Sequence, residues 1–295
     1  MPAVKEFTYA DRQTGPLRLR VWEPSGPVSR ATAVLHLHGG AWRAGTPAML
    51  DSRSSLLAAC GYTVIQVQYR LLGNAAWPAP VTDLRSALRW VIGQAGQLGV
   101  RTDALVLWGH SAGAHIAMMT AATLADAALD HPDDDRSVGI SIGALVDCYG
   151  PVSFHAGDRP LVEIGPAGLD IAAIAANQRS DGALPGFDLL GAPCTQQQAE
   201  SISPLAMAGP DFPPTMAVHG TGDILILPVN SRRVVDSLRS QNVFCELVEF
   251  AGCNHEFDAA PSYAAAVVAH IDVFLRRVLK DPALAEEVSA YSMFG

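Results

Sequence analysis

The 295-residue sequence predicts an α/β fold: a mostly parallel sheet that begins with an antiparallel hairpin and carries helices on both faces. Short apolar runs, typical of buried strands, alternate with longer segments whose apolar residues recur at helical spacing. Right-handed crossovers between parallel strands place the intervening helices on both sides of the sheet. Every chemically suggestive motif follows a predicted strand, which is where such sheets carry their active sites.

The N-terminal half supplies the hairpin and the first parallel strands. Leu17, Leu19 and Val21 alternate with other residue types in the period-two pattern of a half-buried strand. Residues 4–9 are expected to pair with this strand across a turn. The pattern that follows predicts a strand covered on both faces over 31–37, a helix over 47–60, a strand over 62–69 and an amphipathic helix over 81–98.

The C-terminal half continues the alternation. A short apolar run at 104–108 predicts a buried strand, and an alanine- and methionine-rich helix follows it. The remaining pattern predicts strands over 140–149, 215–219 and 243–250, helices over 229–238 and 263–279, and a C-terminal helix within 281–295 packed on the surface.

One long irregular segment interrupts this pattern at residues 150–210, before the strand at 215–219. Loops of this length are usually functional or disordered, and the apolar content of this one favours an ordered lid with a short helix around 169–176. We therefore expect one domain over residues 1–295, with a lid inserted at 150–210.

Composition argues against several classes of protein. The formal net charge of −9 disfavours nucleic acid and anionic membrane surfaces as partners. No apolar run approaches the ~20 residues of a membrane span, and the N-terminus lacks the apolar core of a signal peptide. Five scattered cysteines without C-x-x-C spacing indicate reduced thiols and a cytoplasmic protein. The oligomeric state stays open, a homodimer included.

The sequence G-H-S-A-G at 109–113 places Ser111 between a predicted strand and a predicted helix. A serine hydroxyl is a weak nucleophile and must stand at a sharp turn where a base can reach it. Gly109 and Gly113 remove the Cβ atoms that would crowd such a turn. G-x-S-x-G also occurs by chance in glycine-rich loops, so the rest of the chain must support this interpretation.

Two further strand ends supply the partners of a nucleophilic serine. Asp223 follows the strand at 215–219, and His255 follows the strand at 243–250. The order Ser, Asp, His is one that hydrolytic triads use. His255 is predicted to be the base and Asp223 the residue that orients it. Glu256 and Asp258 are rival carboxylates, but they are too near His255 in the chain to fold back easily onto its ring.

The turn H-G-G-A-W at 38–42 is the predicted oxyanion site. Glycines after a strand let backbone amides face inward, so the candidate donors are the amides of Gly40, Ala41 and Ala112. Trp42 and Phe257 follow catalytic loops and are candidates to line the substrate pocket, with core aromatics as the alternative. The sequence thus predicts acyl transfer, with no cofactor and no metal.

The other histidines near these motifs are interpreted as structural. His38 is expected to anchor its own turn, and His110 and His115 are expected to pack or hydrogen-bond locally. His36 and His38 share one face of a strand, as metal ligands can, but no carboxylate accompanies them.

Taken together, the motifs resemble those of α/β-hydrolases of the esterase/lipase group, in particular the bacterial feruloyl/acetyl-type carboxylesterases. The resemblance covers about residues 5–280. The matching motifs are H-G-G-A-W at 38–42, Tyr69-Arg70 with W-P-A-P-V-T-D at 77–83, G-H-S-A-G at 109–113, D-C-Y-G-P at 147–151, Ser203-Pro204, H-G-T-G-D at 219–223 and N-H-E-F at 254–257. It implies the α/β-hydrolase fold and a serine carboxylesterase that hydrolyses short-chain acyl esters.

Two departures leave alternatives open. Ala41 replaces the third glycine of the usual H-G-G-G turn, and the residues before the first parallel strand read as strands, without a helical N-terminal cap. Both features are similar to the kynurenine formamidase family, whose members hydrolyse an N-formyl amide with the same triad. Some proteins of this fold have lost catalysis and only bind ligands, but here all three triad residue types are present.

Overall fold

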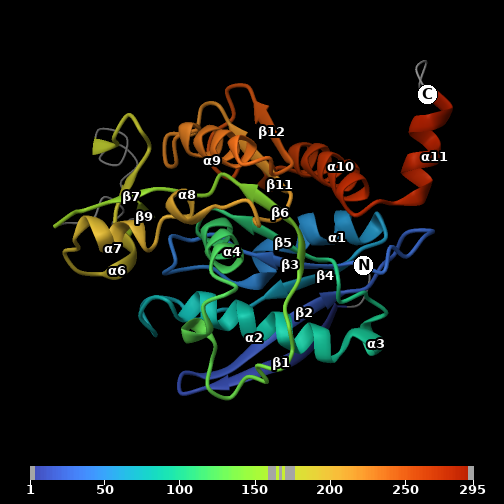
Figure 1. The fold of residues 1–295 in the computed structure, drawn as a ribbon, viewed down its shortest axis with the longest axis horizontal. Coiled ribbons are helices and arrows are strands. Elements are labelled where there is room, and N and C mark those ends of the chain that lie inside the picture. The colour runs from blue at the N-terminus through green and yellow to red at the C-terminus, as the bar shows by residue number, and fades with distance from the viewer. Residues whose placement is uncertain (1–3, 159–163, 166–167, 170–176, 292–295) are drawn as a thin grey trace.

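The computed structural model describes residues 4–158, 164–165, 168–169 and 177–291. Its centre is an eight-stranded sheet with the order β1-β2-β4-β3-β5-β6-β11-β12 (Figure 1). The strands of this sheet are β1 (Val4–Arg12), β2 (Gly15–Trp22), β3 (Ala33–Leu37), β4 (Thr63–Val67), β5 (Leu105–His110), β6 (Ile142–Cys148), β11 (Thr215–Gly220) and β12 (Cys245–Phe250).

The N-terminal hairpin is antiparallel, and the rest of the sheet is parallel. Strand β1 pairs with β2 from Val4 opposite Trp22 to Arg12 opposite Gly15, and β2 runs antiparallel to β4. Strands β4, β3, β5, β6, β11 and β12 all run in one direction. The predicted fold class is therefore confirmed, including the position of the antiparallel pair.

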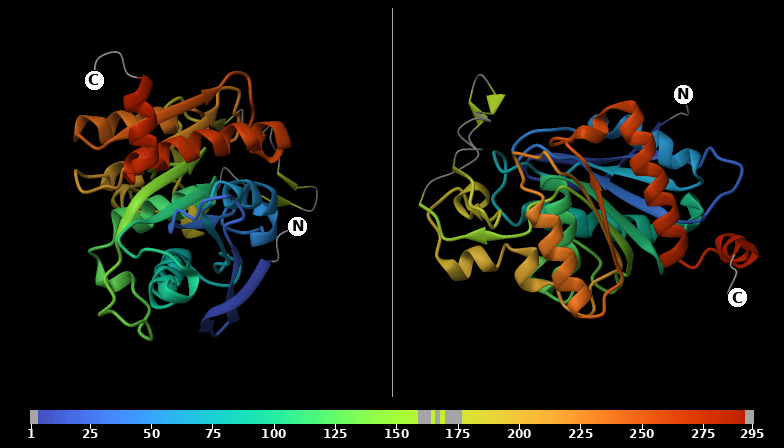
Figure 2. Two further views of the ribbon diagram at one scale, coloured as in Figure 1. Left: turned by 90° about the vertical axis from the view of Figure 1, so that its right-hand side faces the viewer. Right: turned by 90° about the horizontal axis from the view of Figure 1, so that it is seen from above.

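Each face of the sheet is covered by its own helices, because successive strand residues point to opposite sides. Leu35 joins a core formed with α2 (Ala79–Gly93), α4 (Ala112–Ala122) and α9 (Val229–Ser240). Its neighbour Val34 joins a second core formed with α1 (Asp51–Ala59) and α10 (Pro261–Val278). Figure 2 shows the sheet between these helices. Residues of the central strands are buried on both faces, as their continuous apolar sequences predict.

Most predicted boundaries differ from the structure by one or more residues, including those of the helix at 81–98 and the strands at 31–37 and 104–108. The helix expected over 81–98 stops at Gly93, and a separate turn, α3 (Ala95–Leu98), follows; glycine is a poor helix former at such a point. The strand expected from residue 31 begins at Ala33, because Ala31 has a left-handed φ of 49°. Strand β5 extends to His110, two residues beyond the predicted end.

The C-terminal helix α11 (Pro282–Tyr291) is present as predicted, and it projects from the body of the molecule (Figure 1). Leu284 is buried against the body, whereas Val288 is 58% exposed. The predicted surface packing is therefore limited to the first turn. None of the described helices combines the length and the apolar character that crossing a membrane requires.

The segment 150–210 contains only short elements where it is described. These are β7 (Phe154–His155), β8 (Ile164–Gly165), β9 (Gly168–Leu169), β10 (Leu184–Pro185), α6 (Phe187–Leu190), α7 (Gln196–Glu200) and α8 (Pro204–Met207). Strands β7 and β10 form a small parallel pair apart from the main sheet. Of the helix predicted around 169–176, Leu169 belongs to β9, and residues 170–176 lie outside the described part of the chain.

Candidate active site

Ser111 occupies the sharp turn between β5 and α4. Its backbone has φ 52° and ψ −119°, a strained combination that neighbouring structure must enforce. A Cβ on Gly109 would lie 2.4 Å from the amide nitrogen of Ala114, and one on Gly113 would lie 2.4 Å from the carbonyl oxygen of His38. Neither glycine could be replaced without shifting backbone, so the G-x-S-x-G spacing is dictated by close packing at this turn.

The three predicted triad side chains meet at the carboxyl edge of the sheet. His255 Nε2 lies 3.0 Å from Ser111 Oγ, and His255 Nδ1 lies 2.6 Å from Asp223 Oδ2. Ser111 is 8% exposed and Asp223 2% exposed. The imidazole therefore stands between hydroxyl and carboxylate within hydrogen-bond distance of both, the arrangement that general-base activation of a serine needs.

Both oxygens of the Asp223 carboxylate have partners. Its Oδ1 accepts hydrogen bonds from the amides of Leu225 and Ile226, both at 2.9 Å. His219 Nε2 lies 3.3 Å from its Oδ2, next to the donor from His255. Burial raises the pKa of Asp223, but the hydrogen bonds from His219 and His255 outweigh burial and hold that pKa below its usual value. The group therefore stays an anion that can orient the imidazole.

The rival carboxylates lie near the site, but neither hydrogen-bonds the ring of His255: a Cβ on Gly39 would lie 3.3 Å from Glu256 Oε1. Glu256 is exposed and has a left-handed φ of 55°. Asp258 is buried and ion-paired with Arg53, whose NH2 group lies 3.0 Å from its Oδ1. Neither carboxylate hydrogen-bonds the ring of His255 in the described structure, so Asp223 is the carboxylate that the fold brings to this ring.

The glycine turn after β3 lies directly beside the nucleophile. A Cβ on Gly39 would lie 3.2 Å from the Cβ of Ser111. Gly40 and Ala41 have positive φ values of 114° and 48°, and the carbonyl oxygen of Gly40 accepts the amides at 43 and 44. Within the described residues, the amides of Gly40, Ala41 and Ala112 donate to no other group. They are available to a developing oxyanion.

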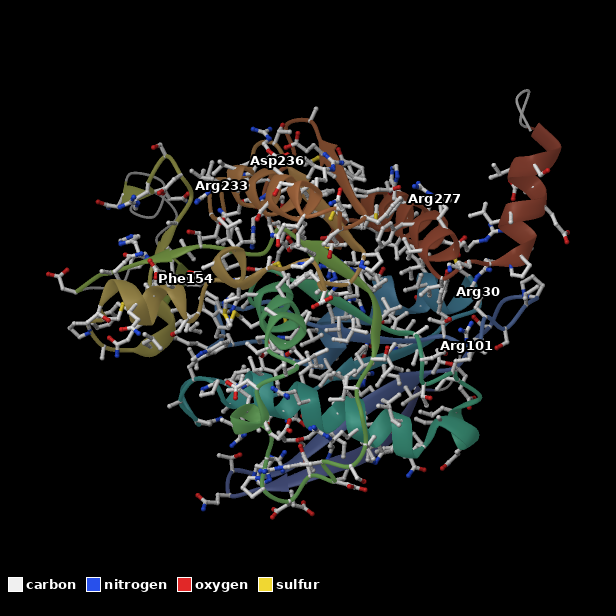
Figure 3. All side chains as sticks on the ribbon, viewed as in Figure 1. Arg30, Arg101, Phe154, Arg233, Asp236 and Arg277 are labelled. Atoms are coloured by element: carbon white, nitrogen blue, oxygen red, sulfur yellow. The ribbon has the colours of Figure 1, made fainter. Side chains whose placement is uncertain are left out.

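The two candidate pocket residues differ in exposure. Trp42 is 2% exposed, and its ring centroid lies 6.0 Å from that of Phe154, a residue of β7 that is labelled in Figure 3. This burial favours the core alternative for Trp42. Phe257 is partly buried, with its ring 6.2 Å from Tyr149 and 5.4 Å from Tyr263.

His115 is a buried structural histidine, and its burial predicts a pH-dependent stability. Nδ1 accepts from Trp42 Nε1 at 3.2 Å, and Nε2 donates to the carbonyl oxygen of Ile202 at 2.8 Å. Burial lowers its pKa to about 4. Below pH ~6.5, His115 is protonated in the unfolded chain but stays neutral in the folded protein. The free energy of unfolding therefore falls as the pH drops from ~6.5 to the folded pKa, by about 1.4 kcal/mol per pH unit.

We expect urea denaturation between pH 7 and 4.5 to show this slope. Burial also lowers the pKa values of His36 and His110 and raises the pKa of Asp147 to about 7, so other groups contribute slopes of both signs in this pH range. The measurement is therefore the slope of the unfolding free energy against pH, compared between wild type and His115→Gln. The slope should be smaller in His115→Gln by about 1.4 kcal/mol per pH unit. Equal slopes in both proteins would contradict the assignment.

The remaining histidines and the nearby cysteine do not make a convincing metal site. His38 Nδ1 lies 2.7 Å from the carbonyl oxygen of Gly39, so it anchors its own turn. His110, Cys148 and Asp258 have ligand-type atoms within 4.8 Å of one another. However, the guanidinium of Arg53 already supplies the positive charge beside that carboxylate. A divalent cation would have to displace it.

Sequence reasoning missed two residues that touch the triad histidine or its carboxylate. His219 contacts Asp223, and the ring centroid of Tyr149 lies 4.7 Å from that of His255. Both lie at the end of a strand, at the same sheet edge as Ser111, and both belong to motifs noted in the sequence, H-G-T-G-D at 219–223 and D-C-Y-G-P at 147–151.

Comparison with known proteins gives a consistent set of matches. The family model described as BD-FAE matches residues 19–238. Esterase LipC of Mycobacterium tuberculosis is 26% identical over 92% of this chain and 64% of its own length. Ethyl acetate hydrolase of Pseudomonas putida is 36% identical over 40% of this chain and 38% of its own. The chain thus spans less than two thirds of the length of these curated relatives.

Solved structures resemble the whole chain. Esterase 2 of Thermogutta terrifontis, phosphoramylated by tabun, matches with a TM-score of 0.74 and 23% identity, over 94% of this chain and 96% of that one. The same esterase with propionate bound matches with a TM-score of 0.72 and 24% identity, over 94% and 95%. At this identity the similarity establishes the fold.

Proposed function

The chain belongs to the BD-FAE family, and we propose that it is a serine carboxylesterase for short-chain acyl esters, with Ser111, His255 and Asp223 as its triad. The observation that carries the proposal is the continuous hydrogen-bonded row Asp223–His255–Ser111, beside three amides that donate to no group in the described part of the chain. A nucleophile, a base with its orienting carboxylate, and an anion site are the parts that acyl transfer requires.

In the proposed acylation step, Ser111 Oγ attacks the ester carbonyl carbon while His255 Nε2 takes the hydroxyl proton. The carbonyl electrons move onto oxygen, and that oxyanion is stabilised by the amides of Gly40, Ala41 and Ala112. The bond to the alcohol oxygen then breaks, and this oxygen takes the proton from His255. Water repeats the sequence on the acyl-enzyme, which releases the acid and regenerates Ser111.

The names of similar proteins support this reaction class. LipC is called an esterase, and a Pseudomonas putida relative is called an ethyl acetate hydrolase. Structures of esterase 2 from Thermogutta terrifontis contain propionate or butyrate, and others carry organophosphates bound covalently. For this chain, these facts favour a substrate with a short acyl group and a Ser111 that reacts with phosphonates.

We expect kcat/KM on p-nitrophenyl esters to be highest for acyl groups of two to four carbons and to fall steeply by about eight. The proposed acyl wall is the glycine turn together with the segment at 150–210, and we expect one such segment not to enclose a long tunnel. Each additional buried methylene would gain only ~0.8 kcal/mol even where room exists. A maximum at long acyl chains would contradict the shallow pocket.

N-formylkynurenine belongs in the same panel, because a formamidase would use the same triad and anion site. The esterase proposal requires acetate or propionate esters to turn over faster than the formyl amide. Faster hydrolysis of N-formylkynurenine would replace it with the formamidase function. Absence of turnover on every substrate, with Ser111 also unreactive toward a fluorophosphonate, would leave only the non-catalytic alternative.

A further inference from the structure

A row of buried polar side chains runs under the triad, and the proposed reaction as described does not use it. Gln66 Nε2 lies 2.9 Å from Ser54 Oγ, which lies 2.9 Å from His36 Nδ1. His36 Nε2 lies 2.8 Å from His110 Nε2, and His110 Nδ1 lies 2.9 Å from the hydroxyl of Tyr149. The Tyr149 hydroxyl is 2.6 Å from Asp258 Oδ1. All six side chains are buried.

The hydrogens of this row point in a single direction. A carboxylate only accepts, so the one hydroxyl proton of Tyr149 goes to Asp258, and Tyr149 must accept from His110 Nδ1–H. His110 is neutral, since burial lowers its pKa, and therefore its Nε2 accepts from His36 Nε2–H. The same reasoning gives His36 Nδ1 as acceptor from Ser54.

The charge at the end of the row is balanced. Arg53 donates through NH2 to Asp258 Oδ1 and through Nε to the backbone oxygen of Asp258, both at 3.0 Å. The second carboxylate oxygen lies 3.3 Å from His110 Nδ1. Oδ1 is thus paired and hydrogen-bonded, as a buried carboxylate requires, while Oδ2 has no hydrogen-bond partner among the described residues. Asp258 is thus fixed from α1, β5 and the end of β6 together.

Tyr149 connects this row to the base. Its ring lies edge-on to the imidazole of His255, with centroids 4.7 Å apart and planes at 63°. Its backbone has a left-handed φ of 46°, a costly conformation for a tyrosine. Asp258 follows His255 by three residues, so the same carboxylate also anchors the loop that carries the base.

We propose that Tyr149 and Asp258 are positioning residues, which hold the imidazole of His255 at the angle needed for proton transfer with Ser111. The ring of Tyr149 limits rotation of the imidazole, and the row from Gln66 to Asp258 holds that ring in place. This role rests on the proposed triad, since it concerns the orientation of its base.

The test is Tyr149→Phe, which removes the hydroxyl and keeps the ring. Small misplacements of a catalytic group cost up to about 100-fold in rate, so we expect kcat to fall about 10- to 100-fold with KM little changed. The matched control is Tyr62→Phe. Tyr62 is also buried and donates to Asp272 at 3.0 Å. It precedes β4, however, and so lies at the amino ends of the parallel strands, away from the carboxyl ends that carry the triad.

The position of the control can be followed in Figure 3, where Arg30, which lies over the ring of Tyr62 at 5.4 Å, is labelled far from Phe154 and the lid. Tyr149→Phe loses two buried hydrogen bonds, to Asp258 and from His110, whereas Tyr62→Phe loses one partly buried bond to Asp272. We therefore expect the larger fall in melting temperature for Tyr149→Phe, and kcat is compared at equal concentrations of folded protein. Only Tyr149→Phe should lose kcat. Equal kcat in the two variants would overturn the positioning role, because loss of the Tyr149 hydroxyl would then have no effect on the base.

Imidazole nitrogen NMR on the full chain tests the row without turnover. We expect His36 to carry its proton on Nε2 and His110 on Nδ1; the opposite tautomer of either would refute the direction. The Nδ1 proton of His255, held by Asp223, should exchange with water faster in Tyr149→Phe than in Tyr62→Phe, and equal exchange would overturn the positioning role.

These readouts separate the two proposals. A wild-type protein that does not react with a fluorophosphonate would refute the proposed function, and proton exchange at His255 would still decide the role of Tyr149. A reactive wild type with an equally reactive Tyr149→Phe variant would refute the positioning role alone. Tyr149→Leu, which also removes the ring contact with His255, should be slower than Tyr149→Phe.

Discussion

Ser111→Ala is expected to lower kcat by about 10⁶-fold, the loss seen when a triad nucleophile is removed elsewhere. The physical reason is that Oγ supplies the bond-forming electron pair and has no substitute nearby. The variant should fold normally, since its Oγ hydrogen-bonds only to His255 among the described residues, and alanine keeps the Cβ at the strained turn. The measurement is p-nitrophenyl acetate hydrolysis at equal folded concentration.

A fluorophosphonate provides the matching control. Mass spectrometry of wild-type protein should find one equivalent of label, on Ser111, and the Ser111→Ala variant should take none. The control variant Ser141→Ala, at an exposed serine before β6, should label and turn over like wild type. Label on another serine, or activity in Ser111→Ala above a tenth of wild type, would rule out this nucleophile.

Asp223→Asn is expected to lower kcat by about 10⁴-fold, as for the corresponding change in other triads. The backbone amides of Leu225 and Ile226 both donate to Oδ1, so an asparagine would keep its carbonyl oxygen there. Its NH2 group would then face Nδ1 of His255, which would have to accept. The imidazole proton would move to Nε2 and point at Ser111, so the ring could not act as base.

Glu256→Gln is the matched control, because it removes an adjacent but exposed carboxylate from the same site. Its kcat should fall far less than that of Asp223→Asn. Glu256 hydrogen-bonds neither His255 nor Asp223 in the described structure, although a Cβ on Gly39 would lie 3.3 Å from its Oε1. Steady-state kinetics on both variants decide the point. If Glu256→Gln were the more damaging change, the orienting carboxylate would have to be reassigned.

Local sequence was enough for the fold because each strand and helix carries its own pattern. Apolar runs at β3, β5 and β11 are continuous since both faces of a parallel strand are covered, and the alternation in β2 marks the one-sided hairpin. Boundaries were less certain: the break after Gly93 and the left-handed φ of Ala31 depend on backbone details that periodicity does not record.

The candidate triad was also predictable from the sequence, for a topological reason. Ser111, Asp223 and His255 each follow a parallel strand, and the carboxyl ends of those strands meet at one edge of the sheet. Their distances to one another then follow from the strand order β5-β6-β11-β12. The spacing G-x-S-x-G indicated Ser111 as the candidate nucleophile, because only glycines fit on either side of its turn.

Only the tertiary structure decided which groups support these residues. Arg53 meets Asp258 from 205 positions away, and Tyr149 meets the same carboxylate from 109 positions away. Tertiary packing likewise buries Trp42, which sequence position alone allowed to line a pocket. A strand or a turn is specified by neighbours in the chain, whereas a buried polar contact depends on packing between distant elements, and one sequence carries no local pattern for it.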